Sequence, residues 1–331
     1  MYSRWKTYSS YLREKYGEAV YRIGVDGGFS CPNRDKTKHG GCAFCDGTGS
    51  IAVYQRVAES GFRRTASYDK ATADTILPRL LSVREQIERG AEFLSRRYKA
   101  RLFSLSFQSW TNTYDDPENL KRIYDEGLSV LPFRELLVST RPDCVGEDVL
   151  DLLESYITEE RDVWVELGLQ SANDNTLRSI NRGHGLAEYM DAVRRIKNHG
   201  LKVCVHIILG LPGEGREDFI ATARAVNDSG AEAVKIHNLH ITGGTALADD
   251  YLSGVCTVMG EERTLESTEL FLRHLSADII IERLISETPY HRLLAPRVFP
   301  DKSKFLRRLE ERMESNDTRQ GDAAESCREG K

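Results

Sequence analysis

The sequence lacks the apolar segments that place a protein in or across a membrane. No apolar run reaches the roughly 18 to 20 residues that a helix needs to cross a bilayer. The start of the chain, MYSRWKTYSSYLREKYG, carries charge throughout and has no apolar core of the kind found in a signal peptide. We therefore expect a cytoplasmic protein with no membrane partner.

An excess of positive charge and a regular cysteine framework are also missing. The formal net charge is -5, which gives no global sign of nucleic-acid binding. The seven cysteines are odd in number and irregularly spaced, which favours a reducing compartment over disulfides. Hydrophobic residues at 40% and charged residues at 29% are ordinary for a globular protein. The cysteines are therefore candidates for metal or redox chemistry.

Short β-rich runs recur along the chain and predict a parallel sheet. From the second run onward they lie about 25 to 40 residues apart, the spacing of strand–helix–strand units, and helical patterns fill the gaps. Such a sheet is either open and doubly wound or a complete or partial barrel, with the chemistry at the carboxyl ends of its strands. The runs span residues 21–25, 101–107, 135–139, 163–169, 201–209 and 233–241.

The last third of the chain predicts two helices and a tail. A helix is expected from about Leu265 to Arg283, and PDKSKFLRRLEERM predicts a final basic helix. The polar end of the chain, poor in apolar residues, is typical of disorder. We expect a core at 1–285 with an N-terminal extension, a helical extension at 286–312 and a disordered tail at 313–331.

Three cysteines gather in the segment CPNRDKTKHGGCAFC, directly after the first predicted strand. Cys31, Cys42 and Cys45 are spaced C-x10-C-x2-C, and two glycines allow a tight turn into the last pair. An Fe–S cluster normally takes four cysteines, so three leave one iron open for another ligand. Zinc would need a fourth ligand, for which His39 is the local candidate. Ordinary buried cysteines are the remaining alternative.

This segment resembles the radical S-adenosylmethionine (SAM) superfamily, in the long-spaced variant shared with the elongator catalytic subunit. The similarity is closer to the bacterial YhcC/YtqA-like family, through CPNRDKT, GGCAFC and the later FQSWTNTY, and it extends from about Tyr8 to Phe305. The resemblance implies a partial (β/α)6 TIM-like barrel of the radical SAM type with a C-terminal helical extension. It also implies a [4Fe–4S] cluster on the three cysteines, with the amino and carboxylate groups of SAM on the open iron.

The same resemblance implies an activity. Reductive cleavage of SAM would give methionine and a 5′-deoxyadenosyl radical, with electrons from a donor such as flavodoxin or ferredoxin. Phe44 occupies the position of an aromatic residue that packs on the adenine of SAM, and Leu209, Gly210 and Leu211 correspond to a segment that lies against adenine.

Further cofactor contacts are expected at the ends of the second and fourth predicted strands. Gln108 is the candidate for the amino end of methionine, where a polar cluster follows the strand. Glu166 is expected to point into the barrel and to bind the ribose hydroxyls, because a lone buried carboxylate needs partners. Gln170 and Ser171 lie at the strand mouth, and Arg182 is expected to pair bidentately with the methionine carboxylate. The alternatives are a capped loop without a ligand and a surface arginine.

Three histidines are further candidates in this region. His206 is more typical of a satisfied core residue than of a catalyst. His237 and His240 are three positions apart and so are expected on opposite faces of a strand. The sequence does not decide which of them faces the pocket.

The elongator-like spacing implies an RNA substrate, most plausibly the wobble uridine of tRNA. Local basic groups support this reading, and charge reversal at Arg307 and Arg308 is expected to weaken RNA binding at low salt. Solvated helix faces, a small-molecule or protein substrate, and a non-catalytic Fe–S or zinc protein are the alternatives. The basic groups are Arg63-Arg64, then Arg96-Arg97 with Lys99 and Arg101, and finally Lys302, Lys304, Arg307, Arg308 and Arg312.

Overall fold

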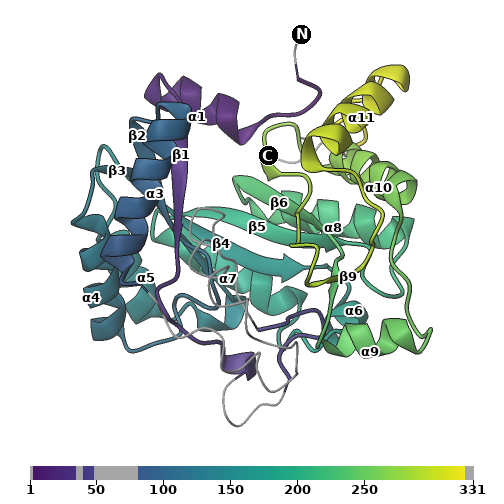
Figure 1. Ribbon diagram of the computed structural model, residues 1–331, viewed down its shortest axis with the longest axis horizontal. Coiled ribbons are helices and arrows are strands. Elements are labelled where there is room, and N and C mark those ends of the chain that lie inside the picture. Colours follow the sequence, from purple (N-terminus) through teal and green to yellow (C-terminus); the bar gives the residue numbers. More distant parts are fainter. Residues whose placement is uncertain (1–2, 35–39, 48–80, 325–331) are drawn as a thin grey trace, which may run out of the picture.

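The computed structural model describes residues 3–34, 40–47 and 81–324 (Figure 1). Seven parallel strands form one sheet in the order β1-β2-β3-β4-β5-β6-β8, curled into a half-barrel. All six predicted strands are present, and the register between neighbours is continuous apart from single irregularities. The strands are β1 Val20–Val25, β2 Leu102–Phe107, β3 Phe133–Thr140, β4 Asp162–Gln170, β5 Lys202–Leu209, β6 Ala233–Asn238 and β8 Ile280–Arg283.

Helices follow the strands and bury the outer face of the sheet in the main apolar core. Helix α4 begins as the sequence predicts, because the Asp116 side chain accepts a hydrogen bond from the backbone N–H of Glu118 and Pro117 fills the first turn. The helices after β1 are α3 Val83–Tyr98, α4 Pro117–Leu128, α5 Glu147–Glu154, α6 Asp174–Ser179, α7 Leu186–Asn198, α8 Arg216–Ser229, α9 Ala246–Leu252, α10 Glu261–His274 and α11 Lys302–Ser315.

The partial barrel is confirmed, but its last strand differs from the prediction. The predicted helix from Leu265 to Arg283 ends at His274, and the chain then forms β8 on the edge of β6. A four-residue strand, Ile-Ile-Glu-Arg, shows too little alternation to be separated from a helix by pattern alone. The sheet therefore has seven strands rather than six.

Helix α1, Tyr8–Tyr16, closes the amino-terminal end of the half-barrel. Thr7 bridges to Ile281 of β8, while the chain after α1 continues into β1, so the helix spans the two edges of the sheet. Tyr8 and Tyr11 both pack edge-on against Trp164 of β4, with ring centroids 6.1 Å apart. This aromatic plug blocks the end of the barrel opposite the cysteine loop.

Part of the predicted disordered tail is ordered. Helix α11 runs to Ser315, and the backbone N–H of Gln320 donates to the carbonyl of Arg4. Thr318 is buried and donates to Glu269 of α10 at 2.8 Å. The expectation of disorder is thus wrong for residues 313–324, because these few polar residues find buried partners that composition does not reveal; residues 325–331 lie outside the described residues. None of the described helices is long and apolar enough to span a membrane.

Candidate active site

The cysteine loop follows β1 and makes two tight turns. The backbone N–H of Arg34 donates to the Cys31 carbonyl, and that of Cys45 donates to the Cys42 carbonyl, both at 2.9 Å. Gly41 has a φ of +67°, and a Cβ there would lie 2.4 Å from Cγ of Arg34. The need for glycine before the last cysteine pair is therefore both conformational and steric. His39, the candidate fourth zinc ligand, lies outside the described residues.

A segment after α6 anchors this loop. The Asn33 amide donates to the carbonyl of Asn181 at 2.7 Å, and the Asn181 amide donates to the carbonyl of Gly41 at the same distance. The backbone N–H of Ala43 donates to the carbonyl of Ile180 at 2.8 Å. The Asn-Arg-Gly motif at 181–183 thus serves first to dock the cysteine loop on the barrel.

Arg182 lies against the sulfur of Cys42. Its Nη1 donates to the Cys42 Sγ at 3.4 Å, and its Nη2 donates to the carbonyl of Gly168 at 2.8 Å. Burial alone would raise the pKa of Cys42, but the guanidinium of Arg182, with that of Arg141, outweighs burial and lowers it. The protein therefore favours the thiolate form that a metal ion requires.

The chemistry of these three donors fits an iron–sulfur cluster better than zinc. A tetrahedral zinc ion with Zn–S bonds of about 2.3 Å holds its sulfurs roughly 3.8 Å apart. Among the described residues, Cys31, Cys42 and Cys45 do not form a trio whose sulfurs all lie within 4.8 Å of one another. A polynuclear core does not require such close sulfurs, because its cysteines bind different irons, and the buried, cation-facing thiol of Cys42 suits a ligand to it.

Beside Cys45 the mouth of the barrel holds a pocket of about 380 Å³, here called the active-site pocket. Phe44 and Gln170, two of the predicted cofactor contacts, both line it. Gln170 adopts a left-handed backbone, with φ +75°, at an irregularity in the pairing of β4 with β5. The remaining lining includes Asp46, His206, Ile208, His237, His240, Arg283 and Arg292.

Strand alternation predicts that His237 and His240 lie on opposite faces, but the structure places them in the same pocket. His206, His237 and His240 all line the active-site pocket. Strand β6 ends at Asn238, so the alternation that would separate His237 from His240 stops before it reaches the second residue. Burial lowers the pKa of all three, with the charges of Lys235 acting on His206 and of Arg283 on His237; that of His240 falls to about 4. The three rings are therefore neutral at neutral pH.

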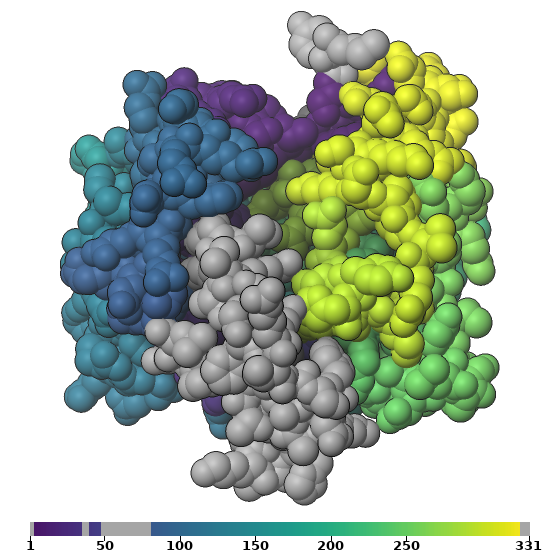
Figure 2. Space-filling view, in the orientation of Figure 1, coloured from purple at the N-terminus to yellow at the C-terminus, as the bar shows by residue number. Residues whose placement is uncertain are grey.

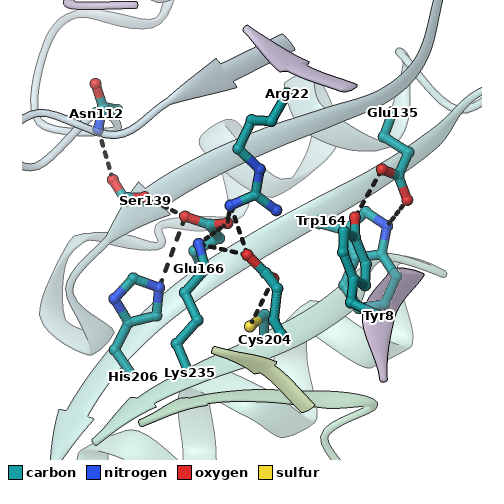
Figure 3. A network of polar contacts seen from close by, with 11 residues as sticks. Tyr8, Arg22, Asn112, Glu135, Ser139, Trp164, Glu166, Cys204, His206 and Lys235 are labelled. Carbon is teal, nitrogen blue, oxygen red and sulfur yellow. Dashed lines mark hydrogen bonds and ion pairs between the residues drawn. The ribbon is translucent and has the colours of Figure 1, made fainter. Parts of the chain in front are cut away.

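Glu166 is not the lone carboxylate that the sequence suggests (Figure 3). It forms ion pairs with Lys235 of β6 and Arg22 of β1, and it accepts a hydrogen bond of 2.6 Å from Ser139. His206 lies 3.6 Å from its second oxygen. The expectation that ribose must satisfy this carboxylate is therefore wrong in its premise, because protein groups already do so.

Together with Glu282 of β8, these side chains make a buried layer across the half-barrel, here called the ionic layer. Arg22 and Lys235 each pair with both Glu166 and Glu282. Burial, which would raise the pKa of Glu166, is outweighed by Lys235 and Arg22, and the net pKa is lowered. Two cations thus balance two carboxylates beneath the active-site pocket. The ionic layer therefore closes the bottom of the active-site pocket.

Other predicted contacts lie away from this pocket. Ser171 donates to Glu214 rather than toward the barrel, and Gln108 packs over Gly24, where a Cβ would meet its Nε2 at 2.3 Å. Leu209 is buried in the outer core because its side chain points to the opposite face from Ile208. Gly210 and Leu211 line a separate pocket near Met259. The structure thus places Leu209 to Leu211 outside the lining of the active-site pocket, and their contact with adenine stays a prediction.

Several residues of the site were not identified from the sequence. Asn33 and Arg34 lie within the cysteine segment, and each donates to a cluster cysteine, Cys42 and Cys45 respectively. Lys235 and Arg283 are charged residues in short strands that begin with apolar residues, AVKIHN and IIER. An internal charge in a strand is the signal that could have identified them, since such a charge must find a buried partner or a ligand.

Part of the predicted basic surface is neutralised. Arg308 forms ion pairs with Glu261 and Glu262, and Arg312 pairs with Glu269 at 2.7 Å. Arg101 pairs with Glu18 in the same way. Arg308 and Arg312 of α11 are thus neutralised by carboxylates of α10, and RNA binding by the remaining basic residues stays a prediction. Arg63 and Arg64 lie outside the described residues.

Two sequence profiles match the chain along most of its length. The profile of the Radical SAM superfamily matches residues 31–226, and that of the Radical_SAM C-terminal domain matches residues 231–315. Protein YhcC of Escherichia coli K12 is 36% identical over 287 residues, which are 86% of this chain and 84% of that protein. YtqA of Bacillus subtilis is 30% identical over 319 residues, 96% of this chain and 92% of its own length.

One solved structure has a similar fold, and part of the sequence is similar to a tRNA-modifying enzyme. Elp3 of the archaeon Methanocaldococcus infernus superposes with a TM-score of 0.65 at 18% identity, over 91% of this chain and 64% of that one. A tRNA uridine(34) acetyltransferase of Dehalococcoides mccartyi is 29% identical over 122 residues, only 36% of this chain and 26% of that enzyme.

Proposed function

The chain belongs to the radical SAM superfamily, whose members use a [4Fe–4S] cluster and SAM, and we propose that it is a tRNA-modifying member. Cys31, Cys42 and Cys45 would hold the cluster. Its chemistry, when bound, is the reductive cleavage of SAM, which yields a radical able to abstract hydrogen. The observation that carries this proposal is the contact of Arg182 with Cys42 in a cysteine loop that opens on the active-site pocket.

The chain's own residues would bind, orient and protect the reactants. Phe44 offers an aromatic face at the rim of the pocket, and Gln170 offers an amide at the end of β4. The aromatic plug of α1 and the buried ionic layer would keep water from entering from below. The neutral histidines can donate or accept hydrogen bonds without adding charge beside the cluster.

A tRNA substrate is supported by two features. The pocket is in the size range of small-ligand sites, so it would take one extruded base rather than a duplex. The partial similarity to a tRNA uridine(34)-modifying enzyme points to the same substrate. We propose the wobble uridine of tRNA as the target, with flavodoxin or ferredoxin as the electron donor.

The activity is tested by anaerobic reconstitution with iron and sulfide, followed by dithionite and SAM. We expect 5′-deoxyadenosine from the wild-type protein and none from Cys42→Ala. Cys256→Ala is the matched control, because Cys256 is also buried but lies in a different pocket, with Met259. A wild-type protein that binds metal but yields no 5′-deoxyadenosine would indicate a non-catalytic binding protein.

The substrate is tested by comparing the nucleosides of tRNA from a deletion strain and its parent. We expect one modified uridine to disappear and to return when the wild-type gene, but not the Cys42→Ala gene, is restored. If every nucleoside is unchanged while 5′-deoxyadenosine still forms, the substrate is a small molecule or a protein.

A further inference from the structure

The half-barrel has an open side between its edge strands, and a second pocket lies there. This pocket, here called the seam groove, has a volume of about 430 Å³ and is lined by residues from the N-terminal segment, β1, β8 and α11. Figure 2 shows this face hollowed between the N-terminal segment in purple and α11 in yellow. Trp5, Tyr8, Arg22, Arg283 and Lys302 are among its lining residues.

Arg283 lies where the seam groove meets the active-site pocket. It lines both pockets, because the pairing of β6 with β8 is irregular at the position where Arg283 faces Lys235. A ligand that extends from one pocket to the other would therefore pass this guanidinium.

No described residue forms an ion pair with Arg283, and the carboxylates that act on its charge, Glu282 and Glu166, already pair with other cations. Within the ionic layer Arg22 and Lys235 already offset Glu166 and Glu282, two charges of each sign. Among the residues that the structure describes, the guanidinium of Arg283 has neither a hydrogen bond nor an ion pair. Its neighbours His206 and His237 are neutral; the Nε2 of His237 is buried without a hydrogen bond, and that of His206 lies 3.6 Å from Glu166.

A half-buried arginine without a partner costs free energy unless a ligand supplies an anion. Lys302, at the start of α11, provides a second cation on the same groove; Glu287 acts on its charge, but no described side chain forms an ion pair with its ammonium. Two cations on one groove favour a ligand that carries more than one negative charge. A single-stranded nucleic acid has this character, with one phosphate per nucleotide.

We propose that the seam groove holds the phosphate backbone of the RNA substrate, with one phosphodiester on Arg283 and a neighbouring one near Lys302. This inference rests on the proposed function, because it assumes that the substrate is RNA. It places the target base in the active-site pocket and the backbone beside it. Arg308 and Arg312 of α11, which pair with carboxylates of α10, play no part in this contact.

The test measures binding of unmodified tRNA to the full-length reconstituted protein by fluorescence anisotropy across a salt series. For Arg283→Gln we expect roughly tenfold weaker binding and a salt slope smaller by about 0.7 to 1, the loss of one phosphate contact. Arg307→Gln is the matched control: it removes the same charge from α11, where the side chain is 69% exposed, and it should bind like wild type. Arg283→Lys should recover part of the affinity.

The outcomes separate this inference from the proposed function. If the wild-type protein binds tRNA and Arg283→Gln binds it equally well with the same slope, the seam groove is not the RNA site, although the proposed function stands. If Arg283→Gln does not fold, exposed Lys302→Gln serves instead, with an expected threefold loss; no loss would overturn the proposal. If the wild-type protein makes 5′-deoxyadenosine but binds no tRNA, both the groove and the RNA substrate are wrong.

Discussion

Arg182 donates a hydrogen bond from Nη1 to the sulfur of Cys42 at 3.4 Å, across 140 residues of sequence. The same guanidinium holds the carbonyl of Gly168, so it ties the cysteine loop to the end of β4. Arg182, which the sequence comparison assigns to the carboxylate of SAM, thus contacts Cys42, a proposed ligand of the cluster. These two bonds use two of the five N–H groups of Arg182, and its Nε is buried without a partner, so N–H groups remain for a ligand.

The first prediction concerns this contact. Arg182→Met keeps a long apolar side chain but removes both hydrogen bonds, so we expect the protein to retain several-fold less iron after reconstitution and desalting. Arg178→Met is the matched control, since Arg178 bonds only to a neighbouring surface amide on α6. Equal iron retention in both variants would show that Arg182 does not support the loop.

Gly41 gives a second prediction. Gly41→Ala places a Cβ within 2.4 Å of Arg34 at a left-handed backbone position, and both effects oppose the turn before Cys42. We expect iron content to fall by at least half, measured by colorimetric iron assay. Gly243→Ala should leave iron content unchanged, because nothing lies within 4 Å of a Cβ there and no positive φ is required.

The ionic layer gives a third prediction, on stability. Lys235→Met leaves Glu166 and Glu282 with only Arg22 between them, so we expect a loss of about 3–5 kcal/mol in the free energy of unfolding. The measurement is urea denaturation of the apoprotein. Lys235→Met with Glu166→Gln removes one charge of each sign and should recover part of the loss; a double variant as unstable as the sum of the two single ones would refute the coupling.

A fourth prediction concerns pH. Burial is the main cause that raises the pKa of Glu135 to about 7 from its ordinary 4.5, against the hydrogen bond from Tyr8. The folded protein therefore binds this proton more tightly than the unfolded chain does. The resulting stability is fully present below about pH 4.5 and is lost as pH rises toward 7, by up to about 3 kcal/mol.

Glu135→Gln tests this dependence, because the amide does not titrate. Relative to wild type, the variant should gain stability between pH 5 and pH 8, as followed by urea denaturation at each pH. A constant difference over this interval would mean that Glu135 is ionised in the folded protein throughout. Glu159→Gln, at an exposed position between α5 and β4, should show no such gain.

The sequence predicts features that arise from local pattern. Alternating apolar runs identify β1 to β6, and Asp116 with Pro117 marks the start of α4, because side-chain periodicity and capping act within a few residues. The cysteine spacing with Gly40 and Gly41 likewise identifies the loop that we propose as the cluster site. These signals can be recognised without knowing which residues distant in sequence lie nearby in the fold.

The remainder depends on contacts between distant residues. Glu166 meets Lys235 across 69 positions, and Arg182 meets Cys42 across 140, so neither partner can be read from its own motif. Strand β8 is too short to show a period, and its charges are explained only by the ionic layer that it completes. The position of His240 was missed for a related reason, since alternation applies only while the strand continues.

The central claim is that Cys31, Cys42 and Cys45 hold a [4Fe–4S] cluster with one iron open to SAM. The most direct test is Mössbauer spectroscopy of anaerobically purified, 57Fe-labelled protein with and without SAM, together with iron and sulfide analysis. We predict about four irons and four sulfides per chain, and a change in the signal of one iron site when SAM is added. Protein that contains zinc alone, or a cluster whose spectrum is indifferent to SAM, would contradict the claim.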